Sequence, residues 1–166
     1  MKVTTTINNQ LYEANLDKPV DLSLPTRHDS FTAWYVDPVT IEPVKGDGFI
    51  GSVEEGGAVN FFDMNINPHG NTTHTECVGH ISKEKEDVNS TVCKFHFKSQ
   101  VITLTPKKLT KNFSKWQRKG DLVFDKEAIK NKLIVGVEAV ILRTQMDYNS
   151  LFTKQYNNTN WPYLLP

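Results

Sequence analysis

The chain has 166 residues, of which 38% are hydrophobic and 23% are charged, an ordinary composition for a globular protein. Its 19 basic residues equal its 19 acidic residues, so the formal net charge is zero. This balance argues against a nucleic acid or an anionic membrane as the main partner, because both usually attract a basic excess. The N-terminus has no apolar stretch typical of a signal peptide, and no apolar run reaches membrane-spanning length. We therefore expect a cytoplasmic location.

The N-terminal half contains several short β-prone runs. Val3–Ile7 and Gln10–Asn15 flank the pair Asn8-Asn9, and asparagine tolerates a positive φ, so this stretch predicts a β-hairpin. Glycine-rich sequence across 46–57 predicts turns. Further strands are expected at Val20–Leu24, Phe31–Val36, Thr40–Val44 and Ala58–Ile66.

The C-terminal half is predicted to begin with a strand over Thr91–Thr105, ended by a proline. A helix is expected from Phe124 to Leu133, with Asp125 as its N-cap. The apolar, β-branched run Leu133–Leu142 predicts a buried central strand, although its period also fits a buried helix. The tail over 147–166 has no clear period. The chain is therefore expected to be strand-rich α/β with one clear helix, and its length predicts a single domain.

A few side chains outside the histidine-rich segment are also candidates for a role. Glu138 lies within the apolar run, so we expect a buried acid that needs a partner, of which Arg143 is one choice. His96, between two phenylalanines in a predicted strand, is expected to face away from them, as a solvent-side or hydrogen-bonded residue. Four aromatic residues could line a substrate pocket or pack in the core: Trp34, Tyr35, Phe61 and Phe62.

Three of the five histidines fall within the twelve residues 69–80, together with Glu76. Neutral imidazole and carboxylate groups are common ligands of Zn²⁺ and Mn²⁺. In an extended segment, residues two apart share a face, so His74 and Glu76 can converge, and His80 can join them. His69 reaches the same point only if the chain turns near Gly70, which glycine permits. The alternative is a polar loop that happens to be rich in histidine.

The segment from Thr73 to His80 resembles the signature His-x-Gly-Thr-His-x-Asp-x-Pro-x-His of the cyclase family of metal-dependent hydrolases. That family includes bacterial kynurenine formamidase and isatin hydrolase. Weaker similarities occur in the same order along the chain, at Asp21-Leu22-Ser23, 121–133, 137–144 and Asn160–Tyr163. The resemblance thus spans residues 21–166, and it implies a swivelling β/β/α arrangement and a dimer or larger homo-oligomer.

Carried over residue by residue, the resemblance assigns three metal ligands and one catalytic residue. His74 matches the second histidine ligand, Glu76 the aspartate ligand, and His80 the catalytic histidine that shuttles protons. His69 matches the first ligand but lies one position too early, where Gly70 holds the strict ligand position. Either the loop bulges to bring His69 to the metal, or that ligand is absent.

The family's chains supply a further histidine and glutamate from a C-terminal part, and no histidine follows His96 here. The chain is then either truncated at its C-terminus or completed by a partner. The resemblance implies an arylformamidase-like hydrolase that uses Zn²⁺ or Mn²⁺. Its substrate would be an amide or a cyclic ester or amide. Its nucleophile would be a metal-bound water, with His80 as the proton shuttle.

Two other classes of function remain open. At Gly70 and Glu76 the chain departs from the family signature. Such departures are also expected in a non-catalytic binding or interaction module with a degenerate metal site. A structural zinc domain is weaker, because such sites favour four closed ligands rich in cysteine and only Cys77 is near the cluster. The expected partner is a small-molecule substrate, with an aromatic amide as one candidate. No nucleic acid and no membrane is expected.

Overall fold

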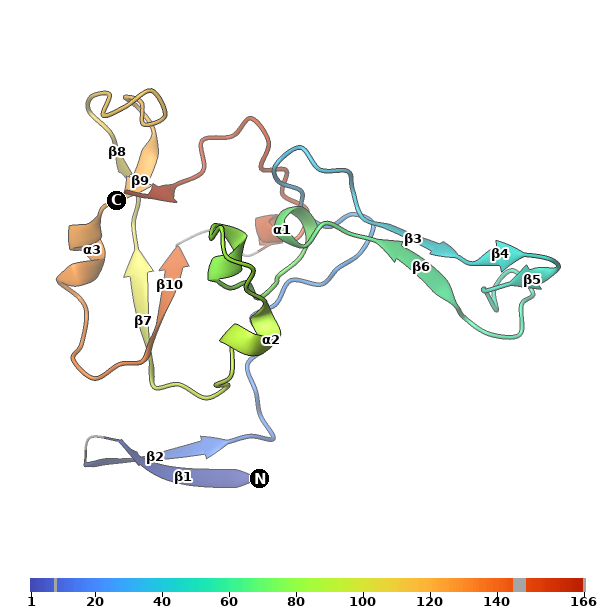
Figure 1. The fold of residues 1–166 in the computed structure, drawn as a ribbon, viewed down its shortest axis with the longest axis horizontal. Coiled ribbons are helices and arrows are strands. Elements are labelled where there is room, and N and C mark those ends of the chain that lie inside the picture. Colours follow the sequence, from blue (N-terminus) through green and yellow to red (C-terminus); the bar gives the residue numbers. More distant parts are fainter. Residues whose placement is uncertain (8, 145–148, 166) are drawn as a thin grey trace. The chain divides into compact units, whose positions relative to one another are not determined.

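The computed structural model describes residues 1–7, 9–144 and 149–165 (Figure 1). The chain divides into two compact units. Unit 1 comprises residues 1–22, 76–145 and 160–166, and unit 2 comprises residues 23–75 and 146–159. Short strands dominate the described residues and the helices are short, so the predicted strand-rich α/β class is confirmed. The single domain remains a prediction.

Unit 1 begins with the predicted hairpin. Strands β1 (Lys2–Ile7) and β2 (Gln10–Asn15) pair antiparallel, with Lys2 opposite Asn15 and Ile7 opposite Gln10. Asn9 has a φ of 63°, in the left-handed region that asparagine tolerates best after glycine. The hairpin prediction is therefore confirmed, while Asn8 of the turn lies outside the described residues.

Two further small sheets are formed by the described residues of unit 1 (Figure 1). Strand β7 (Ser99–Leu104) pairs in parallel with β10 (Ala139–Thr144). In the second sheet, β9 (Leu122–Phe124) pairs antiparallel with β8 (Lys107–Lys108) and in parallel with β11 (Tyr163–Leu164). The predicted strand over 91–105 is shorter than expected, because helix α2 (Val88–Thr91) and a loop precede β7.

The apolar core of unit 1 is built from Ile102, Leu104 and Phe124, each no more than 6% exposed. Ala128 and Ile129 of helix α3 (Lys126–Lys130) pack against it. Asp125 caps this helix, since its side chain accepts a 2.8 Å hydrogen bond from the Ala128 amide. The predicted N-cap is thus confirmed, and the helix is shorter than the ten residues expected.

The predicted buried strand over residues 133–142 is wrong in its first half, where no strand forms, and it is also wrong in its burial, because eight of the ten residues are exposed. Strand β10 begins only at Ala139, and Val135 is 94% exposed. Glu138 is also exposed, so the expected buried acid is wrong as well. Its carboxylate pairs with Lys94 rather than with Arg143, and it accepts a 3.0 Å hydrogen bond from the Lys98 amide. These bonds, the Lys94 one first, lower the pKa of Glu138.

Unit 2 carries a long antiparallel arm (Figure 1). Strand β3 (Thr40–Pro43) pairs with β6 (Phe62–Asn65), with Thr40 opposite Asn65. Between them, β4 (Lys45–Gly46) and β5 (Phe49–Ile50) form a tight hairpin. Its turn, Asp47-Gly48, has φ values of 48° and 82°, as an Asp-Gly hairpin turn requires. The strands expected near Thr40 and before Ile66 are confirmed, in shorter form.

The interior of unit 2 is largely polar. Its buried residues include Ser30, Thr32, Ser52 and Asn71 beside Val39. The Thr32 main chain pairs with the segment that follows helix η2 (Asn149–Leu151), through bonds to Lys154 and Tyr156 of 3.2 and 2.8 Å. Side-chain and backbone hydrogen bonds thus take the place of apolar packing here.

The expected strands over 20–24 and 31–36 are not formed. Trp34 and Tyr35 both have a φ of 58°, a left-handed conformation that is strained for bulky side chains. Tyr35 is held there by Asn157, whose side-chain oxygen accepts a 2.9 Å bond from the Tyr35 amide, and by a 2.8 Å bond from its hydroxyl to Asn158. No helix in the described part of the chain is long and apolar enough to cross a membrane.

Candidate metal centre

His69 lies in helix α1 (Pro68–Asn71), a single turn whose beginning is fixed by Asn67. The Asn67 side chain accepts a 3.1 Å hydrogen bond from the Gly70 amide, as an N-cap does. Proline follows at the first helical position, where its missing N–H costs nothing. The polar sequence Asn67-Pro68 therefore forms a turn, rather than continuing strand β6.

Two contacts hold this turn against the rest of unit 2. The Asn71 side chain, 1% exposed, accepts a 2.8 Å bond from the Asn67 amide and donates a 3.3 Å bond to the Asp37 carbonyl. A Cβ at Gly70 would lie 2.4 Å from the Val36 Cγ2 atom, so only glycine fits there without a shift. Gly70, which the resemblance places at the strict ligand position, thus serves backbone packing.

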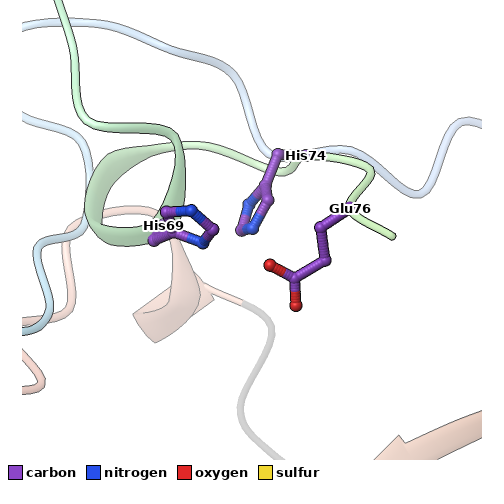
Figure 2. Close-up of side chains that lie close together, drawn as sticks. All are labelled: His69, His74 and Glu76. Atoms are coloured by element: carbon purple, nitrogen blue, oxygen red, sulfur yellow. The ribbon is translucent and has the colours of Figure 1, made fainter. Parts of the chain in front are cut away.

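The turn near Gly70 that His69 needs in order to approach His74 is present. Figure 2 shows the side chains of His69, His74 and Glu76 pointing toward one another. One potential ligand atom from each residue lies within 4.8 Å of the other two. The two imidazole rings meet edge to face, with centroids 4.8 Å apart and planes at 81°. All three side chains come from one eight-residue stretch of the chain.

A backbone carbonyl orients the His74 ring. Its Nδ1 lies 3.1 Å from the Thr72 carbonyl oxygen, and a carbonyl can only accept, so Nδ1 carries the proton. The other ring nitrogen, Nε2, then presents its lone pair. This is the arrangement by which metal-ligating histidines fix their tautomer in proteins.

His80 ends the short helix η1 (Val78–His80), one turn beyond the cluster. Its Nδ1 lies 3.7 Å from Glu76 Oε2, and both side chains are about half exposed. Glu76 is thus the residue that joins the two parts of the segment, with the histidine pair on one side and His80 on the other. Cys77, partly buried between them, is not part of the cluster.

Two imidazoles and a carboxylate are a donor set that fits Zn²⁺ or Mn²⁺. Three protein ligands with open positions are typical of catalytic rather than structural zinc sites. Ligand atoms that share one tetrahedral ion lie roughly 3.4 Å apart, so the widest separation in the cluster, 4.8 Å, would have to shrink by about 1.4 Å. All three side chains are exposed, so rotamer changes can supply this movement.

Unit 2 contains a cavity of about 300 Å³ beside the α1 turn. Of the four aromatic residues proposed to line a pocket, Tyr35 lines this one. Phe61 and Phe62 are 57% and 44% exposed on the arm, so neither is packed in a core. The remaining lining comes from two stretches of chain: Val36–Pro38, and Asn65 to Asn67 with Asn71.

The sequence predicted a turn near Gly70 and Asn71, with Pro68 suited to it, but the role of Asn67 was missed. Asn67 followed by Pro68 is a readable helix start, since asparagine is a preferred N-cap and proline a preferred first residue. The roles of Thr72 and Asn71 had no such signal. The contact of the Thr72 carbonyl with His74 depends on the local backbone conformation, and the buried Asn71 amide depends on the distant Asp37. His28 and His96 are exposed and lie outside the cluster.

Comparison with known proteins gives one match, to a protein family. The model of the family described as "Putative cyclase" matches residues 20–166, which includes the whole segment from His69 to His80. No curated protein and no solved structure matches the chain.

Proposed function

The chain belongs to the putative cyclase family, and on that premise we propose that it is a metal-dependent hydrolase acting on an amide or on a cyclic ester or amide. Family membership supports a cyclase- or hydrolase-like enzyme, and the arylformamidase-like reaction is the specific proposal. The observation that carries it is the convergence of His69, His74 and Glu76 within 4.8 Å. In this proposal the three side chains hold a divalent ion, Zn²⁺ or Mn²⁺.

When bound, such an ion lowers the pKa of a coordinated water and polarises a carbonyl oxygen, which is the chemistry that amide hydrolysis needs. The chain's own residues prepare the site for it. The Thr72 carbonyl keeps the proton of His74 on Nδ1, so Nε2 faces the cluster as a ligand atom. The α1 turn, fixed by Asn67 and Asn71, aims His69 at the same point.

His80 is proposed as the group that moves the proton. Its imidazole lies 3.7 Å from the Glu76 carboxylate, near the ligands without being one of the three. A histidine so placed can accept a proton from the attacking water and give it to the departing nitrogen. The Glu76 carboxylate holds that ring beside the cluster, so one side chain both binds the ion and positions the acid–base residue.

The proposed substrate is a small molecule with an amide or ring amide bond, an aromatic amide being the leading candidate. The cavity beside α1, of about 300 Å³, is at the lower end of small-molecule sites, although none of the three proposed ligands lines it. The polar backbone and amide groups around it suit hydrogen bonding to such a ligand. A homodimer or larger homo-oligomer remains part of the proposal, and light scattering of the purified chain measures it.

The experiment uses the full chain, loaded with Zn²⁺ or Mn²⁺ and assayed on an aryl formamide for release of formate and arylamine. We expect turnover that His80→Ala reduces by at least about a hundredfold, the usual contribution of a positioned acid–base group. Bound metal, measured by elemental analysis, should stay within twofold of the parent. His74→Ala should instead remove both metal and turnover.

His96→Ala is the matched control, because this histidine is exposed and lies outside the cluster. It should leave metal content and turnover unchanged. Turnover that survives His80→Ala at parent level would defeat the assignment of that residue. Turnover that survives His74→Ala, in a chain depleted of metal, would defeat the metal-dependent reaction as a whole.

A second candidate is a binding module with the same fold and no catalysis. The exposure of all three cluster residues favours it, because catalytic sites usually exclude water from the reacting atoms. Titration with Zn²⁺ or Mn²⁺ under calorimetry separates the two. Absence of measurable affinity for either ion supports the binding module, whereas stoichiometric binding with turnover supports the hydrolase.

A further inference from the structure

The zero net charge of this chain conceals a strong local imbalance. Residues 107–119, the basic loop, contain six cations and no acid. The rest of the chain therefore has thirteen cations against nineteen acids. The basic loop comprises strand β8 and the turn that leads from it toward β9 in unit 1 (Figure 1). An average over the whole chain says nothing about a surface whose charge is gathered in one loop.

Two large aromatic side chains stand exposed among these cations. Phe113 is 57% exposed and Trp116 is 76% exposed. The Lys111 ammonium lies 5.4 Å from the Phe113 ring centroid, and the Lys115 ammonium lies 4.9 Å from that of Trp116. Each ring thus has a cation beside it, so apolar and positive groups share one surface.

The loop is an ordered turn rather than a loose tail. Its base is closed by two backbone bonds of 2.9 Å, from the Leu109 amide to Asp121 and from the Gly120 amide to Leu109. At its tip, the Ser114 hydroxyl accepts 3.1 Å bonds from the amides of Trp116 and Gln117. The backbone that carries the aromatic rings is thereby fixed, while the rings themselves remain in solvent.

Little of the positive charge is neutralised within the chain. Lys107 pairs with Asp125 at 3.0 Å, and the Asp121 carboxylate faces the Arg118 amide at 2.8 Å. Among the described residues, no ion pair is found for the four remaining lysines of the loop: Lys108, Lys111, Lys115 and Lys119. Their charge faces outward and is available to an anionic partner.

We propose that the basic loop is a membrane-contact site that docks on anionic phospholipid bilayers, with Trp116 and Phe113 at the level of the headgroups. Tryptophan and phenylalanine flanked by lysine are the groups that enter the membrane interface while cations bind the headgroups. A single-stranded nucleic acid fits less well, because proteins that bind it line a groove with their aromatic rings, and this loop is a protruding turn. The site is independent of the metal centre and of the proposed reaction.

The test is co-sedimentation of the full chain with large vesicles of phosphatidylcholine, with or without 30 mol% phosphatidylserine, at low salt. Each cation near an anionic surface raises affinity by about fivefold, so four lysines predict much tighter binding to the charged vesicles. Lys111→Gln with Lys115→Gln should weaken that binding by about tenfold or more. Raising the salt concentration should weaken it as well, because exposed charges are screened.

Matched variants elsewhere in unit 1 control for total charge and aromatic content. Lys83→Gln with Lys85→Gln makes the same charge change at exposed positions and should leave vesicle affinity within twofold. Phe95→Ala removes an aromatic ring that is 81% exposed and should also have no effect, whereas Phe113→Ala should weaken binding. Circular dichroism of every variant checks that the fold is kept.

Tryptophan fluorescence locates the contact. Charged vesicles should shift the emission to the blue, and Trp116→Phe should abolish the shift while Trp34→Phe retains it. Equal affinity for neutral and charged vesicles would overturn the proposal, as would loss of the shift in Trp34→Phe alone. Binding of an oligothymidylate without binding to vesicles would overturn it in favour of nucleic acid. A loop variant that changes only the oligomeric state would overturn it in favour of an interface between copies.

Discussion

The two units of this chain are stabilised in different ways. Unit 1 buries apolar side chains, with Ile102, Leu104 and Phe124 packed under helix α3. Unit 2 buries mostly small polar side chains, such as Thr32 and Asn71, and closes its interior with hydrogen bonds. Apolar side chains can pack in several orientations, whereas a buried hydrogen bond requires one relative orientation of its donor and acceptor. The turn that aims His69 is therefore held by the kind of contact that specifies orientation.

The largest effect is expected from Leu104→Ala in the apolar core, where the parent side chain is 1% exposed. The substitution should lower the free energy of unfolding by about 2–5 kcal/mol, from lost burial and the cavity left behind. Urea denaturation followed by circular dichroism measures it. Val101→Ala, at a position 54% exposed on the same strand, is the control and should cost far less. Equal losses would show that β7 does not have its inner face on this core.

The corresponding change in unit 2 is Asn71→Ala. It removes the bonds to the Asn67 amide and the Asp37 carbonyl, and leaves both groups without their partner. An orphaned group costs about 1–3 kcal/mol, and the long 3.3 Å bond to the Asp37 carbonyl falls at the low end of that range, so a loss of roughly 2–4 kcal/mol is expected. Metal affinity should also fall by about tenfold, because the turn carrying His69 loosens. Full metal affinity in a destabilised variant would break the link between the polar interior and the site.

Gly70→Ala tests the close packing of the same turn. The added methyl would meet Val36 Cγ2 at 2.4 Å and the Ala33 carbonyl oxygen at 3.0 Å. We expect a loss of about 1–3 kcal/mol, the usual cost of overpacking. Val36→Ala in the same chain should recover part of that loss, because it removes the nearer contact. A double-mutant cycle by thermal unfolding measures the coupling, and purely additive losses would contradict the contact.

A smaller, pH-dependent effect is expected at Asp125, the N-cap of α3. The hydrogen bond from Lys107, and then that from the Ala128 amide, lower the pKa of this carboxylate. Its pKa is therefore lower in the folded than in the unfolded chain, where it is about 3.9. The stabilisation by this carboxylate is present at a pH above its pKa in the unfolded chain. It is lost as the pH falls through its lower pKa in the folded chain.

Asp125→Asn keeps a capping side chain and removes the charge. The melting temperature of this variant should lie below that of the parent at pH 7. The difference should vanish at a pH below the pKa of Asp125 in the folded parent. Scanning calorimetry across this range measures it. Glu127→Gln on the same helix is the control, since its carboxylate is exposed. A difference in melting temperature that grows on acidification would contradict the expected stabilisation by the Asp125 charge.

The smallest effect on stability is expected at the candidate ligands themselves. His74 is exposed, so His74→Ala should change the free energy of unfolding of the metal-free chain by no more than about 0.5 kcal/mol. Added Zn²⁺ should raise the melting temperature of the parent and not that of the variant, because an ion that binds the folded chain stabilises it. If neither Zn²⁺ nor Mn²⁺ changes the melting temperature of the parent, the result favours the binding module.

Elements specified by local chemistry were predicted from the sequence. The β1–β2 hairpin follows from two β-prone runs around an asparagine pair, and the beginning of α3 follows from the cap at Asp125. The run over 133–142 was predicted wrongly, because apolar composition cannot reveal which neighbours cover it. Eight of its ten residues are exposed, and its acid, Glu138, pairs with Lys94 on a segment distant in sequence.

The sequence by itself determined the family match, the hairpin and the spacing of His74, Glu76 and His80, because these depend on residues close along the chain. Only the tertiary structure decided that His69 joins them. That outcome rests on Gly70 packing against Val36 and on Asn71 bonding to Asp37, more than thirty residues away. A buried hydrogen bond between distant segments leaves no local pattern, and so the direction of His69 could not be read before the fold was known.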